Sequence, residues 1–186
     1  MVISPHKFIL RAHYFDFNSA LHGAGHTYRV MCNSLVLGKR LKFYRESRLA
    51  LCAAFIHDMA RKHDGMCTMH GAWAAAEKLP LFRDLFLSVG VMPNEIEEIG
   101  MAVTNHSLPE ELLSSHDYFV TTAILKDADA LDRIRLGENN LKPAFLRFAE
   151  SLELIPVSER LYYETNGITD LDFDKTLRIY ASLIRI

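Results

Sequence analysis

Apolar residues along most of this chain recur three and four positions apart, and few segments alternate apolar and polar residues with a period of two. The first spacing places apolar side chains on one face of a helix, whereas the second is typical of strands. We therefore predict an all-α protein folded as a single-domain, compact helical bundle. The predicted helices span residues 4–17, 26–41, 46–60, 69–79, 94–105, 117–136, 141–152 and 173–184.

Residues at the ends of these segments support the predicted boundaries. Ser4 followed by Pro5 is typical of a helix start, since serine accepts from unpaired backbone N–H groups and proline in the first turn loses no hydrogen bond. Asn94 with Glu97 three residues later has the spacing of a capping box. Pro80 is expected to end the helix that precedes it.

The segment 46–60 is apolar on nearly all sides of its predicted helix, which is typical of a buried central helix. It ends close to the polar pair His57 and Asp58. Burying an ionised carboxylate without a partner is unfavourable, and a divalent cation removes that penalty. Neighbouring side chains on a helix point about 100° apart. The pair can therefore bind one metal ion together, or Asp58 can bridge two.

Further ligands must come from other helices, and His26 and Asp129 are candidates because each lies on an apolar helix expected to pack against the central one. His22 competes with His26, since a spacing of four residues lets both face one metal ion. We favour His26 as the ligand and expect His22 nearby, as a group that supports the ligands or contacts the substrate.

These residues give the chain a resemblance to the HD superfamily, whose pattern is a His, then an adjacent His-Asp pair, then a distant Asp. The matching segments are HGAGHTYRV around His26, FIHDMAR around His57, and LKDADALDRIRLG around Asp129. The resemblance covers about residues 21–137. It implies an HD-type helical domain with metal-dependent phosphohydrolase activity.

The resemblance also extends the ligand set. The family's last Asp belongs to an Ala-Asp dipeptide, which selects Asp129 and leaves Asp127 and Asp132 as acids that support the ligands or lie at the surface. His70 in MHGAWAA and His106 in VTNHS resemble the additional ligands of HD branches that hold two metal ions. The implied ligands are His26, His57, Asp58, His70, His106 and Asp129.

Mixed His and carboxylate ligation suits iron, manganese or another first-row metal, so we expect one or two divalent ions as the cofactor. Asp58 is the expected catalytic group for proton transfer. Arg29 and Arg61 each lie three residues after a ligand, one helical turn away, where a guanidinium can bind substrate phosphate. For both arginines a salt bridge at a helix end is the alternative.

The expected reaction is hydrolysis of a phosphate ester or anhydride in a small, nucleotide-like substrate. One alternative is a diiron oxygenase, because some HD-like proteins use a similar six-ligand set with dioxygen. A second alternative is a degenerate HD domain used for ligand sensing or partner binding. The sequence identifies neither the substrate nor the oligomeric state.

Composition agrees with one ordinary globular domain over residues 1–186, with the motifs in a core at about 21–137 and a C-terminal helical cap at about 141–186. The net charge of -2 gives no general attraction to nucleic acid polymers or anionic membranes. The three cysteines lack a CxxC spacing and indicate free thiols in a reducing compartment. The N-terminal residues lack the apolar run of a secretory signal, so we expect a cytoplasmic protein.

Overall fold

The computed structural model describes residues 4–137 and 139–184, and these residues form helices and connecting loops without a β-strand. The helices are α1 (Ala24–Arg40), α2 (Tyr44–Ile56), α3 (His70–Glu77), α4 (Leu79–Ser88), α5 (Ile96–His106), α6 (Phe119–Leu131), α7 (Ala149–Thr165) and α8 (Phe173–Leu183). Short 3-10 helices are η1 (Pro5–Lys7), η2 (Ala12–Tyr14), η3 (Pro93–Glu95), η4 (Arg133–Leu136) and η5 (Pro143–Phe145). The all-α prediction is confirmed, and the protein is one domain.

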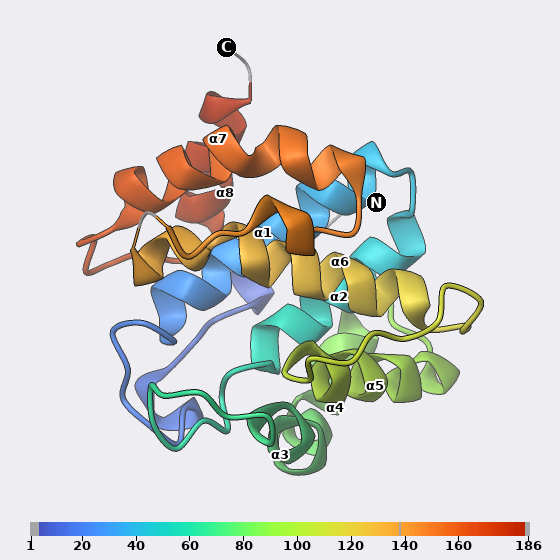
Figure 1. Ribbon diagram of the computed structural model, residues 1–186. Helices are drawn as coiled ribbons and strands as arrows, with labels where there is room; N and C mark the ends of the chain where they lie inside the picture. The colour runs from blue at the N-terminus through green and yellow to red at the C-terminus, as the bar shows by residue number, and fades with distance from the viewer. Residues whose placement is uncertain (1–3, 138, 185–186) are drawn as a thin grey trace.

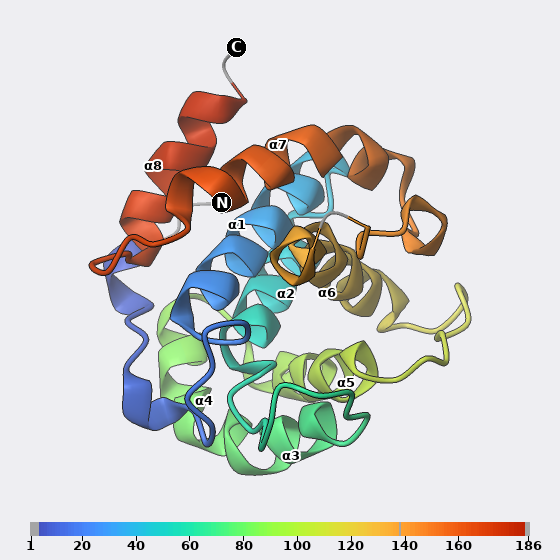
Figure 2. The same ribbon diagram turned by 60° about the vertical axis from the view of Figure 1, so that its left-hand side comes forward.

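The helices are arranged around a central group formed by α1, α2 and α6 (Figures 1 and 2). Helices α7 and α8 cover α1 on one side of this group. On the opposite side, α5 packs against α2 and α6, and α3 packs between α5 and α4. The division into a core at about 21–137 and a cap at about 141–186 stays a prediction.

Helix α2 is the buried central helix expected from the sequence, and the side chains from Leu49 to Ile56 are almost completely inaccessible. It lies very close to α1, because a Cβ atom added at Gly38 would be 2.2 Å from the Cβ of Ser47. The Ser47 hydroxyl donates to the carbonyl oxygen of Ser34 at 3.1 Å, which satisfies the polar group at this contact. This packing brings the C-terminal end of α2 beside α1.

The predicted helix over 4–17 is wrong. The segment forms only η1 and η2, joined by extended chain, because tertiary contacts determine its path. Phe8 is buried, with its ring 5.5 Å from that of Phe55 and 5.7 Å from that of Phe173. The backbone N–H of Leu10 donates to the Tyr28 hydroxyl at 2.9 Å. These contacts require the segment to cross α1, α2 and α8 rather than coil on itself.

Proline and capping residues account for two further differences. Pro80 lies in the first turn of α4, where its missing N–H costs no hydrogen bond, so it begins a helix that the sequence analysis did not predict. The Glu95 carboxylate accepts from the backbone N–H of Met92 at 2.8 Å. The capping pair predicted at Asn94 and Glu97 is therefore wrong by two residues.

The predicted helix over 141–152 is also displaced, since α7 begins only at Ala149 and continues to Thr165. The carboxylate of Asp127 on α6 accepts from the backbone N–H of Phe148 at 3.1 Å and from the Ser151 hydroxyl at 2.6 Å. These hydrogen bonds satisfy donors at the helix start that no residue of α7 itself satisfies. Asp127 therefore fixes the start of α7 and has no place among the ligands.

The state of the cysteines and the apolar character of the helices complete the description of the fold. Cys32, Cys52 and Cys67 are all free, as the sequence predicted. Among the described residues, no helix combines the length and the apolar character that crossing a bilayer requires.

Candidate metal centre

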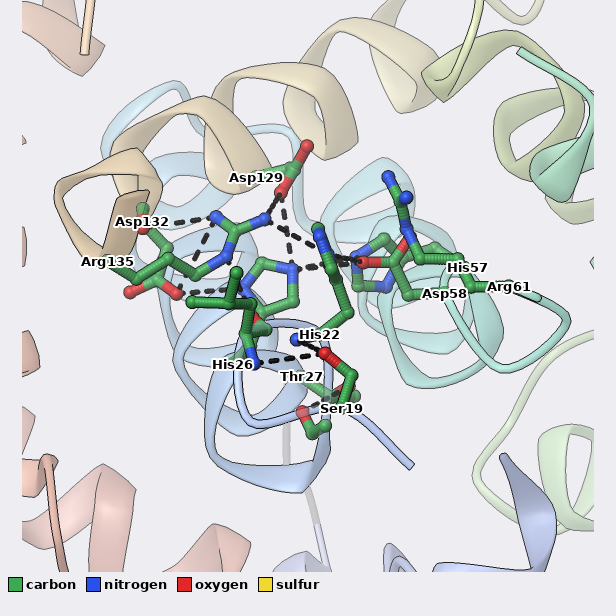
Figure 3. A network of polar contacts seen from close by, with 12 residues as sticks. Ser19, His22, His26, Thr27, His57, Asp58, Arg61, Asp129, Asp132 and Arg135 are labelled. Carbon is green, nitrogen blue, oxygen red and sulfur yellow. Dashed lines mark hydrogen bonds and ion pairs between the residues drawn. The ribbon is translucent and has the colours of Figure 1, made fainter. Parts of the chain in front are cut away.

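Histidine and aspartate side chains from five helices and their ends converge in the interior of the bundle. Figure 3 shows the part of this cluster around His26, Asp58 and Asp129. His26 comes from α1, and His57 with Asp58 follows the last turn of α2. His70 begins α3 and His106 ends α5. The cluster is completed by Asp129 of α6 and by His22, which precedes α1.

Asp58 lies at the centre of this cluster and is 4% exposed. One carboxylate oxygen, Oδ2, is 2.8 Å from Nδ1 of His22 and 3.4 Å from Nε2 of His26. The other, Oδ1, is 3.1 Å from Nε2 of His70 and accepts from Nε of Arg61 at 2.8 Å. The two oxygens therefore face different groups of histidines, as a carboxylate that bridges two metal ions would.

His70 and His106 meet through their Nε2 atoms, which are 2.9 Å apart. On the other side of each ring, Nδ1 donates to a backbone carbonyl, that of Cys67 for His70 and that of Val103 for His106. In the neutral imidazole the second nitrogen is then an acceptor, so two lone pairs point at one another. Such a contact is unfavourable unless a cation or a proton lies between the rings.

His26 and His57 repeat this arrangement, with their Nε2 atoms 3.1 Å apart. Nδ1 of His57 donates to the Ala54 carbonyl at 2.7 Å, and Nδ1 of His26 is 2.7 Å from the carboxylate of Asp132. Metal-binding histidines commonly use one ring nitrogen in this way, which fixes the ring while the other binds the ion. All four histidines are therefore held with Nε2 directed into the cluster.

Asp129 supplies a carboxylate oxygen that needs a partner. Its Oδ1 atom is buried without a hydrogen bond, although it lies 3.3 Å from Nε2 of His26 and 3.5 Å from a terminal nitrogen of Arg135. A buried polar atom without a partner is costly. The donor set consists of imidazole nitrogens and carboxylate oxygens, which fits a first-row divalent cation.

The ligand atoms are close enough together to share an ion. Three groups each place their nitrogen and oxygen atoms within 4.8 Å of one another. These groups are His22 with His26 and Asp58, His26 with His57 and Asp129, and His57 with Asp58 and His106. The cluster could therefore hold one or more metal ions.

The combined effects of burial and charge shift the pKa values of His57 and His26 in opposite directions. Burial lowers the pKa of His57 to about 3, against the attraction of the Asp58 carboxylate. For His26, burial and the charge of Arg135 also lower the pKa, but the nearby carboxylates of Asp129, Asp132 and Asp58 outweigh them and raise it to about 9. Without metal, His26 therefore carries the proton that a bound cation would displace.

The carboxylates remain ionised in spite of their burial. Burial by itself raises the pKa of Asp58, but His57 and hydrogen bonds with the other histidines hold it well below its usual range. Burial also raises the pKa of Asp129, but His26 and the charge of Arg135 outweigh this effect and hold the pKa well below its usual range. Two negative charges thus face the centre of the cluster, one on the buried Asp58 and one on the partly buried Asp129.

Asp132 supports the ligands from behind and is buried, so of the two roles open to it from the sequence the structure shows the supporting one. Its carboxylate contacts Nδ1 of His26 and also accepts from Nε and Nη2 of Arg29, at 2.6 and 3.0 Å. Arg135, which the sequence analysis missed, donates to the backbone carbonyls of Asp132 at 3.1 Å and Leu21 at 2.9 Å. The available signal was the three-residue spacing from Asp129 to Asp132 to Arg135, which repeats one helical turn.

The two arginines expected at substrate phosphate occupy different environments. Arg29 is committed to Asp132, lies over the Tyr162 ring at 5.1 Å, and borders a cavity of about 410 Å³. The salt bridge, the alternative that the sequence left open, is therefore what the structure shows for Arg29. Arg61 also forms a salt bridge, through Nε with the Asp58 carboxylate at 2.8 Å, and its Nη1 donates to the Gly65 carbonyl at 3.2 Å.

A larger cavity of about 840 Å³ borders the cluster at His106 and Asp129. Its volume lies in the usual range of small-molecule sites. Four cationic side chains and an apolar wall line it, contributed by α6, η4, η5 and the loops around them: Lys126, Arg133, Lys142, Arg147, Leu108, Phe145 and Leu146. The ligand cluster and this cavity together form a candidate active site.

Comparison with known proteins gave no match, neither to a family model, nor to a curated protein, nor to a solved structure. The helical fold with its His and Asp cluster is compatible with an HD-like domain. The function of the protein is therefore inferred from the chemistry of the site.

Proposed function

We propose that this protein is a metal-dependent phosphohydrolase with an HD-type centre, acting on a phosphate ester or anhydride of a small, nucleotide-like substrate. The observation that carries the proposal is the pair of facing imidazole contacts, 2.9 and 3.1 Å, arranged around the shared carboxylate of Asp58. The adjoining cavity adds cationic side chains to the same site. Metal ligands beside a cation-lined cavity suit an anionic phosphate substrate.

The chain offers two groups of ligands around Asp58. His26, His57 and Asp129 would hold one ion, while His70 and His106 would hold a second, with Asp58 shared between them. When bound, the divalent ions would supply Lewis-acid activation of water and of the phosphoryl oxygens. Iron and manganese suit this donor set best.

The protein's own side chains have distinct roles in this proposal. Asp58 is the candidate for orienting the reacting water and taking part in proton transfer, because its carboxylate lies at the centre of the ligand cluster. Arg61 is 13% exposed and donates to Asp58 through Nε, so its terminal nitrogens could contact a phosphate oxygen. His22 contacts the other Asp58 oxygen and keeps the carboxylate oriented.

The test combines metal content with turnover. Wild type, Asp58→Asn and His106→Ala are purified in parallel, and metals are counted by inductively coupled plasma mass spectrometry. Asp84→Asn is the matched control, since Asp84 is an exposed acid on α4. Each protein is then assayed with Mn²⁺ or Fe²⁺ for hydrolysis of three substrate classes. Phosphate release is measured with nucleoside monophosphates, and the nucleotide products are separated by chromatography for dinucleoside polyphosphates and cyclic dinucleotides.

The expected result is nearly two metals per wild-type chain, about one in His106→Ala, and phosphate release that Asp58→Asn abolishes and Asp84→Asn leaves intact. Wild-type metal content near zero would overturn the metal centre. Full activity of Asp58→Asn would overturn the role of Asp58. Turnover that requires both reduced iron and dioxygen would assign the site to an oxygenase instead.

A further inference from the structure

We infer that the substrate carries a second anionic group, separate from the phosphate that reacts, and that Arg133 and Lys142 bind it. This inference rests on the proposed function and narrows its substrate class. Both side chains line the 840 Å³ cavity at the end formed by η4 and the loop that follows, outside the ligand cluster.

The two inner cations of the cavity are already neutralised by protein acids. Arg147 donates to the Glu111 carboxylate through Nε at 2.8 Å and to Asp127 through Nη1 at 2.9 Å. Lys126 donates to the same Glu111 carboxylate at 3.0 Å and to the Glu110 carbonyl at 2.9 Å. These contacts hold the wall in place and leave little positive charge for a ligand.

The two outer cations, Arg133 and Lys142, are different. Both are exposed, and neither has an acidic partner within 4.0 Å among residues 4–137 and 139–184. Nε of Arg133 donates to the carbonyl oxygen of Asn140 at 3.2 Å, and the Asn140 side chain in turn donates to the Leu136 carbonyl at 2.8 Å. This orients the Arg133 guanidinium, and its terminal nitrogens have no hydrogen-bond acceptor among the residues that the structure describes.

The contacts of Arg133 place its charge apart from the ligand cluster. Arg133 follows the ligand Asp129 by four residues, but the arginine within 4.0 Å of the Asp129 carboxylate is Arg135, not Arg133. The hydrogen bond from Nε of Arg133 to the Asn140 carbonyl instead directs the guanidinium toward the loop that carries Lys142. An anion bound between Arg133 and Lys142 would therefore lie on the loop side of the cavity, apart from a phosphate held at Asp129 and His106.

Apolar side chains of the same cavity indicate what joins the two anions. Phe145, on η5, is 72% exposed and lies with Leu146 and Leu108 in the wall of the cavity. An exposed aromatic ring beside a cation-lined cavity suits the ring system of a nucleoside or a similar flat scaffold. The inferred substrate class is therefore a nucleoside-like compound with anionic groups at two positions.

The test measures binding with probes whose C–P bonds resist hydrolysis. Butane-1,4-bisphosphonate and butylphosphonate are titrated into the manganese-loaded protein by calorimetry, at 50 and 500 mM NaCl. Wild type is compared with Arg133→Gln/Lys142→Gln. The control is Arg11→Gln/Lys39→Gln, which removes the same charge from two exposed positions outside the cavity.

We expect wild type to bind the bisphosphonate about tenfold more tightly than the monophosphonate, as one added charge-assisted contact allows. The advantage should disappear in Arg133→Gln/Lys142→Gln, persist in the control, and shrink at 500 mM NaCl. Equal affinities in wild type, or an advantage that survives in Arg133→Gln/Lys142→Gln, would overturn the inference. Because no turnover is involved, a failure of phosphate release would count against the proposed function alone.

Discussion

Gly71 of α3 lies so close to α5 that a Cβ atom at this position would be 2.3 Å from the carbonyl oxygen of Val103. The same carbonyl accepts the hydrogen bond from Nδ1 of His106. The absence of a side chain at Gly71 therefore allows α3 to approach α5 until His70, its neighbour, meets His106. Helix packing and ligand geometry depend on one another at this position.

Gly71→Ala should push α3 away from α5 and separate His70 from His106. Overpacking of this kind costs about 1–3 kcal/mol, so the unfolding free energy in urea should fall by that amount. Metal content should fall toward one ion per chain. Gly100→Ala is the control, because a Cβ there would meet only the flexible end of the Leu79 side chain, at 3.1 Å. Unchanged metal content in Gly71→Ala would contradict the argument.

Arg29 and Arg61 should differ in what their removal costs. Arg29→Ala leaves the buried carboxylate of Asp132 without its main cation, which is expected to cost about 3 kcal/mol or more. In Arg61→Ala the partner Asp58 keeps His22 and His70, so a loss nearer 1 kcal/mol is expected. Urea unfolding measures both. An Arg29→Ala variant as stable as wild type would show that the salt bridge does not stabilise the fold.

Removal of Arg61 should affect substrate binding more than stability. Arg61→Ala should raise KM for a phosphate substrate and leave metal content unchanged, since Arg61 is not a ligand. The measurement is a KM and kcat comparison on metal-loaded enzyme. A variant with unaltered KM would remove Arg61 from substrate binding.

The metal-free protein should be most stable near pH 6.5. Folding raises the pKa of His26 to about 9, so its stabilising contribution is complete below about 6.5 and is lost as pH rises through 9. Folding lowers the pKa of His57 to about 3, so the unfolded chain takes up a proton below about 6.5 and stability falls toward acid pH. Protonation of Asp58 and Asp129 adds to the loss of folding stability below about pH 4.

Urea unfolding after treatment with a chelator, at pH 5, 6.5 and 8.5, measures this profile. His26→Gln should flatten the alkaline side, whereas His6→Gln, at an exposed histidine, should leave it unchanged. Stability that increases between pH 6.5 and 8.5 in wild type would contradict the role given to His26.

Bound metal should stabilise the fold, because the facing histidine nitrogens then share a cation. At an ion concentration about 1,000 times Kd, each site contributes about 4 kcal/mol. Thermal unfolding should show a larger rise in Tm with Mn²⁺ than with Mg²⁺, since imidazole ligands favour first-row metals. His57→Asn should reduce the rise. Equal shifts with both ions would argue against histidine ligation.

The sequence predicted much of this site because its chemistry is local. His57 and Asp58 are adjacent at the end of an apolar helix, and that contrast is visible without a structure. The six implied ligands converge in the structure, and His22 lies beside Asp58, near the ligands as expected. What could not be predicted depends on distant contacts: Arg135 reaches the Leu21 carbonyl only after α1 and α6 have packed.

The same reason explains the errors in the fold. The N-terminal segment has a helix-start signal at Ser4 and Pro5, but the burial of Phe8 against Phe55 determines its path. The start of α7 is fixed by Asp127, a residue more than twenty positions earlier in the chain. Local patterns identified most of the helical segments, whereas long-range partners decided where several helices begin.

The side chains of the cluster differ in exposure, and this difference restricts the order in which an ion and a substrate could bind. His22, His26, His57, Asp58 and His70 are at most 5% exposed, whereas the Asp129 side chain is 23% exposed beside the large cavity. An ion and a substrate would then use the same entrance, with the ion entering first and leaving last. A bound substrate would block this entrance, so the protein should lose its metal to a chelator more slowly when it is saturated with substrate than when no substrate is bound.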